Sequence, residues 1–118
     1  MKKTMELPVL SEAGLGKRFK IFIEIARHPQ GMSMSEVTTV FTKEKQGSKK
    51  FSYVKQGILY HISALRKAGF ISMNYDVQNG RVVLICTATL LGVSTVQEEM
   101  CRLCTVLHEI EKEMKNAA

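Results

Sequence analysis

The sequence has 118 residues, of which 45% are hydrophobic and 24% are charged, and its formal net charge is +6. This length fits one domain of ordinary size with a hydrophobic core of its own. Polar residues interrupt every apolar stretch before it reaches the roughly 18 residues of a membrane span. The residues after Lys2 and Lys3 do not form the apolar segment of a signal peptide. We therefore expect one domain, residues 1–118, in a cytoplasmic protein that does not enter a membrane.

The charge is distributed unevenly along the chain. Residues 1–85 contain 14 Lys and Arg against 6 Asp and Glu, whereas residues 86–118 contain 3 against 5. A basic first part favours a polyanionic partner. Nucleic acid is the partner that we expect, because the sequence has no basic amphipathic segment suited to a membrane surface.

The first predicted helix covers residues 13–28 and ends before Pro29 and Gly31. Its expected core stripe, from the helical spacing of apolar residues, is Leu15, Phe19, Phe22, Ile23 and Ala26. Ile21 and Ile25 lie off this stripe, so they pack either against a partner subunit or into a wide buried face. We assign them to a dimer interface. His28 suits the C-terminal end of this helix.

A second, short helix is predicted from the capping-box pair Ser33 and Glu36 to about Thr42. The segment 42–50 (TKEKQGSKK) has no apolar residue and predicts a solvated loop. A third helix follows from Ser52 to Ala68, with Gly69 as its C-terminal cap. Its expected inner side is Val54, Ile58, Ile62 and Leu65, and its outer side is Ser52, Tyr53, Gln56, Tyr60, Ser63 and Lys67. His61 falls beside the inner side, and we interpret it as a packed residue.

After Gly69 the apolar residues alternate with polar ones, which is typical of a strand. Asn79-Gly80 favours a two-residue type I′ turn and therefore a β-hairpin. The turn fixes the register, which opposes Val77 to Val82, Tyr75 to Leu84 and Met73 to Cys86.

The last predicted helix is long and begins after Thr89, which is its candidate N-cap. Its apolar residues recur three or four positions apart, the heptad spacing of a seam between two helices: Val93, Val96, Met100, Leu103, Leu107, Ile110 and Met114. We expect this helix to form a homodimer; the alternative is an amphipathic helix folded onto its own domain. With the two isoleucines of the first helix, the expected dimer interface is Ile21, Ile25, Val96, Met100, Leu103, Leu107, Ile110 and Met114.

Two local sequences resemble winged helix-turn-helix repressors of the bacterial ArsR and MarR type. Residues 61–71 (HISALRKAGFI) are similar to the end of the recognition helix and the start of the wing in that family. Thr89-Leu-Leu-Gly92 resembles the Thr-x-x-Gly step from the wing into the last helix. The resemblance implies a mainly α fold with a small β-hairpin (α+β), in which residues 13–88 form the DNA-binding core and residues 89–116 the dimerisation helix. The segment 42–50 is longer than the corresponding connection of the family.

The resemblance also implies that helix 52–68 enters the DNA major groove and that the wing, residues 71–87, contacts adjacent backbone or the minor groove. Lysines near the start of the helix suit phosphates, and Gln56 can form two hydrogen bonds with adenine. Arg81 at the hairpin tip suits a phosphate or the minor groove. The candidate DNA-binding residues are Lys49, Lys50, Ser52, Tyr53, Lys55, Gln56, Tyr60 and Arg81.

Cys101, Cys104 and His108 lie at positions i, i+3 and i+7 of the last predicted helix, followed one turn later by Glu111. Thiolate and imidazole are ligands for zinc or a softer metal, and ArsR-type sensors place metal sites on this helix. Spacing alone is a weak zinc signal without a second group of ligands, so we predict no metal and no cofactor. The sequence also lacks a phosphate-binding loop and any catalytic constellation, which predicts a protein that is not an enzyme.

Four functions remain open from the sequence. A dimeric transcriptional repressor is the first. The second is a centromere-binding adaptor of plasmid segregation, which would join DNA to a filament-forming protein. The others are a metal-sensing repressor and a winged helix that binds only protein.

Overall fold

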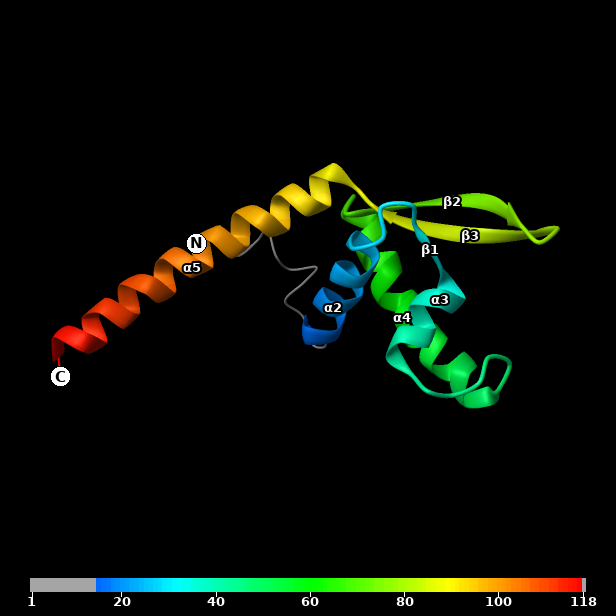
Figure 1. Cartoon of the computed structure of the whole chain (residues 1–118), viewed down its shortest axis with the longest axis horizontal. Helices are drawn as coiled ribbons and strands as arrows, with labels where there is room; N and C mark the ends of the chain where they lie inside the picture. The colour runs from blue at the N-terminus through cyan, green and yellow to red at the C-terminus, as the bar shows by residue number, and fades with distance from the viewer. Residues whose placement is uncertain (1–14, 118) are drawn as a thin grey trace.

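The computed structural model describes residues 15–117. This part of the chain contains four helices and three strands: α2 (Leu15–Ala26), β1 (Met32–Ser33), α3 (Met34–Phe41), α4 (Lys49–Lys67), β2 (Ile71–Gln78), β3 (Arg81–Ala88) and α5 (Leu90–Ala117). The first three helices pack with the base of the sheet, α5 extends away from them, and the β2–β3 hairpin extends in roughly the opposite direction (Figure 1). The fold is α+β and mainly α, as the sequence predicts. Among the helices within residues 15–117, none combines the length and the hydrophobicity of a membrane-spanning segment.

The core lies between α2, α4 and the sheet. Helix α2 contributes Ile21, Phe22 and Ile25, which are all 0–1% exposed. The prediction that Ile21 and Ile25 lie at a dimer interface is therefore wrong, because their own chain buries both side chains completely. Of the expected core stripe, Phe22 is fully buried, whereas Phe19, Ile23 and Ala26 are half-buried at the edge of the core. The Leu15 side chain lies outside the described part of the structure. The buried face of α2 is therefore displaced by one residue from the predicted stripe.

Helix α4 begins at Lys49, three residues before the predicted start at Ser52. Ser48 is the N-cap, because its side-chain oxygen accepts a hydrogen bond of 3.1 Å from the backbone N–H of Phe51. Phe51 is only 3% exposed and anchors this first turn. Lys49 and Lys50 therefore belong to a helix rather than to the predicted solvated loop. Further along, Ile58, Ile62 and Leu65 are fully buried as predicted, and Val54 is half-buried.

The sheet has the strand order β1–β3–β2, and all pairs are antiparallel. The predicted hairpin register is confirmed at Val77–Val82, Tyr75–Leu84 and Met73–Cys86. Asn79 and Gly80 both have positive φ, 53° and 74°, as a type I′ turn requires. The third strand was not predicted: two residues, Met32 and Ser33, pair with the base of β3.

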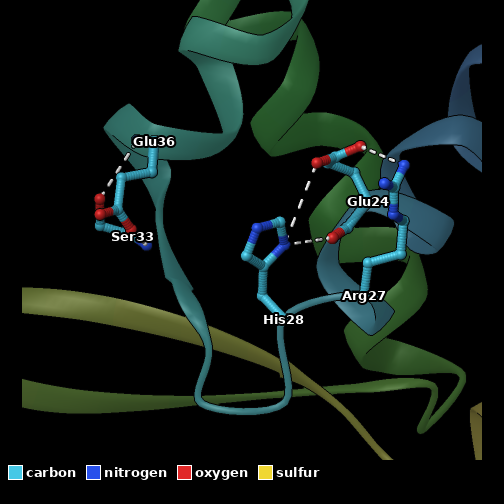
Figure 2. Close-up of polar contacts among 5 residues, drawn as sticks. All are labelled: Glu24, Arg27, His28, Ser33 and Glu36. Carbon is cyan, nitrogen blue, oxygen red and sulfur yellow. Dashed lines mark hydrogen bonds and ion pairs between the residues drawn. The ribbon is translucent and has the colours of Figure 1, made fainter.

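The connection between α2 and α3 is held by local polar contacts (Figure 2). The predicted capping box is confirmed, since the Ser33 side chain accepts from the Glu36 N–H and the Glu36 carboxylate accepts from the Ser33 N–H. At the end of α2, Nδ1 of His28 donates to the Glu24 carbonyl oxygen at 2.9 Å, which is the helix-terminal role predicted for His28. Glu24 also lies 3.9 Å from Arg27.

Helix α5 starts on the core and then leaves it. Thr89 is its N-cap as predicted, since Oγ1 accepts from the Gly92 N–H at 3.0 Å and donates to the Gly69 carbonyl oxygen at 2.6 Å. Gly92 lies so close to Phe70, the residue before β2, that a Cβ atom there would stand 2.7 Å from the carbonyl oxygen of Phe70. Val96 is 6% exposed and belongs to the core. Its assignment to the dimer seam is wrong, because its own domain covers it.

Candidate nucleic-acid interface

Side chains of the N-terminal half of α4 alone line a shallow, open groove of about 480 Å³ on the surface of this helix. Five of the predicted DNA-binding residues line it: Lys49, Lys50, Ser52, Tyr53 and Gln56. All five side chains are exposed, and Tyr53 is 83% exposed. Lys55 is half-buried next to this set. The sequence-predicted outer side of the helix is therefore one continuous polar and basic surface.

Lys49 and Lys50 occupy the first turn of α4, which contains no acidic residue. Cations at this end of a helix oppose the partial positive charge of the unpaired N–H groups. The two lysines therefore do not serve the stability of α4. Together with the helix end, they create a positive potential that attracts an anion.

Tyr60 lies about two turns beyond Tyr53 on α4 and is 64% exposed. Its ring meets the His61 ring edge-on at a centroid distance of 5.6 Å, and the guanidinium carbon of Arg18 lies 5.5 Å from the Tyr60 centroid. Arg18 itself is only 3% exposed, and its Nε donates a hydrogen bond of 2.8 Å to Nδ1 of His61. A buried arginine on α2 thus contacts the side chains of Tyr60 and His61 on α4.

Arg18 is not among the site residues that the sequence predicts. The signal was nevertheless present, because Arg18 has helical spacing with Ile21, Phe22 and Ile25, the residues that α2 buries. Burial lowers the pKa of His61 from its ordinary value, and the nearby Arg18 and Lys17 lower it further. A neutral imidazole can accept the hydrogen bond from Arg18, so His61 is the packed residue that the sequence predicts.

The β2–β3 hairpin differs from α4 in its surface chemistry. Its strands and turn contain one cation, Arg81, and one carboxylate, Asp76. Arg81 is exposed beside the turn but does not line the α4 groove. Beyond the core, the hairpin exposes Tyr75, Val77 and Val82 on one side. The hairpin tip and the N-terminal end of α4 both lie on the side of the molecule opposite to the free end of α5 (Figure 1).

The three metal-ligand candidates lie on the part of α5 outside the core. Cys101 and Cys104 are free and exposed, and the His108 side chain is 81% exposed. Nδ1 of His108 lies 4.0 Å from a Glu111 carboxylate oxygen. Within residues 15–117 of this single chain, no three His, Cys, Asp or Glu side chains come together in a way that could hold a metal ion.

Comparisons with protein-family models, with curated proteins and with solved structures found no match. The function is therefore inferred from the chemistry of the α4 surface and from the arrangement of the elements around it.

Proposed function

We propose that this protein is a sequence-specific double-stranded DNA-binding protein of the winged helix-turn-helix type that acts as a dimeric transcriptional repressor. In this proposal α3 and α4 form the helix-turn-helix, α4 is the recognition helix and the β2–β3 hairpin is the wing. The element order and the two family-like local sequences support the arrangement.

The observation that carries the proposal is the α4 groove, where Lys49 and Lys50 stand at a helix N-terminus beside the exposed side chains of Tyr53 and Gln56. Lysines at that place fit backbone phosphates, which contribute affinity without sequence information. Gln56, one to two turns further along, can reach base edges when the N-terminal half of the helix lies in the major groove. Arg81 on the wing would contact flanking phosphate or the minor groove.

The test separates these two roles. A preferred duplex is first selected from a random pool, and affinities for it and for a scrambled duplex are then measured by fluorescence anisotropy over a series of salt concentrations. Lys50→Ala weakens binding to both duplexes and reduces the salt slope by about 0.9 for each lost phosphate contact. Gln56→Ala costs roughly 1 to 3 kcal/mol on the preferred duplex and leaves the scrambled duplex unaffected.

The matched control is Lys112→Ala, because Lys112 is an exposed lysine on α5, away from the groove. This variant binds both duplexes like the unmodified protein. If Gln56→Ala retains full discrimination while Lys50→Ala removes it, α4 does not dock as proposed. Absence of binding to any duplex at low salt would refute the function as a whole.

Occupancy of the genome tests the repressor role. A repressor occupies a few operator half-sites next to promoters. Spreading over a long array of repeats would instead identify the segregation adaptor.

A further inference from the structure

The part of α5 beyond the core exposes an apolar stripe that nothing in the described chain covers. Every residue from 100 to 117 is exposed. The stripe contains Met100, Leu103, Val106, Leu107, Ile110 and Met114, which are between 37% and 69% exposed. Single apolar residues scattered over a protein surface are common, but these six large apolar side chains form one continuous stripe over about four turns of helix. Such a stripe is typical of an interaction surface.

The spacing of this stripe identifies its partner as another helix with the same repeat. Met100, Leu107 and Met114 occupy one core position of a heptad, and Leu103 and Ile110 occupy the other. No charged residue interrupts these positions from 100 to 114. A second copy of α5 offers a surface of matching length and polarity, so the stripe fits a homotypic pair of helices.

The residues next to the two heptad core positions, Val106 among them, favour one orientation of the pair. In a parallel pair, flanking positions of opposite type meet, which would place Val106 against Glu111 of the second copy and Cys104 against Glu99 of the second copy. In an antiparallel pair, flanking positions of the same type meet. Val106 then faces Val106 and Cys104 faces Cys104, one pair on each side of the seam. The antiparallel pair joins apolar groups where the parallel one opposes an apolar group to a carboxylate.

Two further flanking contacts of the antiparallel pair bring Gln97 near Glu111 and Glu99 near Glu113 of the second copy; only the second contact joins two carboxylates. Glu99 is already paired within its own chain, since its two carboxylate oxygens accept from Nε of Arg102 at 2.9 and 3.0 Å. A further contact of 2.8 Å joins it to the Arg102 guanidinium. This local pair offsets the repulsion between the two carboxylates.

We propose that two copies of this chain associate through an antiparallel pair of α5 helices, with the two-fold axis at the level of Thr105. This inference rests on the dimer of the proposed function and specifies its geometry. With a rise of 1.5 Å per residue, the two Gly92 residues lie about 39 Å apart along the rod, each next to its own core.

Cross-linking through native cysteines tests the orientation without DNA. In the antiparallel pair, Cys104 of the two copies meet beside the seam, whereas Cys101 lies on the outer side of each helix. Cys101→Ser leaves Cys104 as the exposed thiol, and a short bismaleimide links its two copies at least tenfold faster than it links the matched variant Cys104→Ser, which retains Cys101. A second variant places the only exposed thiol on the other side of the seam: Val106→Cys combined with Cys101→Ser and Cys104→Ser also forms the cross-linked dimer.

Light scattering on the same samples separates the possible failures. A dimer in which neither position 104 nor position 106 cross-links is not antiparallel about this axis, and the inference is overturned while the DNA-binding proposal stands. If light scattering finds only a monomer at the concentrations used for cross-linking, no α5 pair forms and the inference is overturned. Leu103→Asp buries an unpaired charge in the seam and abolishes both the dimer and the cross-link; an unchanged dimer in this variant would also overturn the inference. Loss of DNA binding without loss of the cross-link would instead contradict only the proposed function.

Discussion

Thr89 connects the end of α4, the start of β2 and the first turn of α5 through hydrogen bonds. The number of these bonds gives the expected loss of stability when its hydroxyl group is removed. Its hydroxyl donates to the Gly69 carbonyl after α4 and accepts from the Gly92 N–H in the first turn of α5. Its own N–H donates to the Phe70 carbonyl at 2.9 Å. Thr89→Val keeps the branched shape and the backbone contact but removes both hydroxyl contacts.

A net contribution of about 1 kcal/mol per hydrogen bond gives an expected loss of about 2 kcal/mol in the free energy of unfolding. Loss of a helix N-cap alone typically costs about 1 kcal/mol, which is consistent with this sum. For a domain of this size, the loss corresponds to a decrease in Tm of about 8 °C. Urea unfolding and thermal unfolding, both followed by circular dichroism at a fixed protein concentration, measure the two quantities.

Thr105→Val is the matched control, because the Thr105 hydroxyl donates only to the Cys101 carbonyl on the exposed surface of the same helix, at 3.1 Å. We expect a change below about 0.5 kcal/mol for this variant. Equal stability losses for the two variants, or no loss for Thr89→Val, would refute the role of Thr89 as the connection between α4 and α5.

Two further predictions concern titrating groups whose pKa burial changes, the half-buried His61 and the buried Cys86. Because burial lowers the pKa of His61, the unfolded chain binds a proton there more readily than the folded one, and His61 destabilises the fold as the pH falls below about 6.5. His61→Gln removes this part of the pH dependence in urea unfolding at pH 7.5 and 5.5, whereas the exposed control His108→Gln retains it; identical pH profiles for wild type and His61→Gln would exclude the effect. Burial raises the pKa of the Cys86 thiol to about 11, so iodoacetamide at pH 8 modifies the two exposed cysteines of α5 first and reaches Cys86 only in urea. Simultaneous modification of all three thiols in the native protein would contradict the burial of Cys86.

Local chemistry made part of this fold predictable. The Asn79-Gly80 turn fixes both the hairpin and its register, because the conformation of two residues determines which strand positions face each other. The capping box at Ser33 and the N-cap at Thr89 are equally local signals, and the structure confirms both.

The elements that sequence patterns missed depend on contacts distant in the chain. Strand β1 is two residues long, too short for any periodicity, and exists because it pairs with β3. The start of α4 was predicted too late because Ser48 is followed three residues later by Phe51, not by the Glu or Gln of a capping box. The burial of Ile21 and Ile25 in their own chain depends on the angle at which α2 meets α4 and the sheet, which spacing along one helix cannot determine.

The candidate site also has a part that local sequence predicts and a part that depends on contacts distant in the chain. The exposed side of α4 could be derived from 100° steps along one helix, and the structure brings five of the named residues together in one groove. The contact between Arg18 and His61 joins residues 43 positions apart and required the packing of α2 on α4.

The absence of a side chain at Gly92 also has a mechanical consequence. The backbone of α5 rests there directly on the backbone of Phe70, and a Cβ atom would stand 2.7 Å from one of its atoms and 2.9 Å from another. From this contact to its end at Ala117, α5 extends as an arm about 38 Å long, and the contact at Gly92 is the pivot for any tilt of that arm. A tilt of about 10° at the pivot displaces the far end of such an arm by about 7 Å, twice the rise of one DNA base pair. Gly92→Ala, which adds a single methyl group at the pivot, would therefore change the direction of α5 relative to the core and the position of whatever binds its far end.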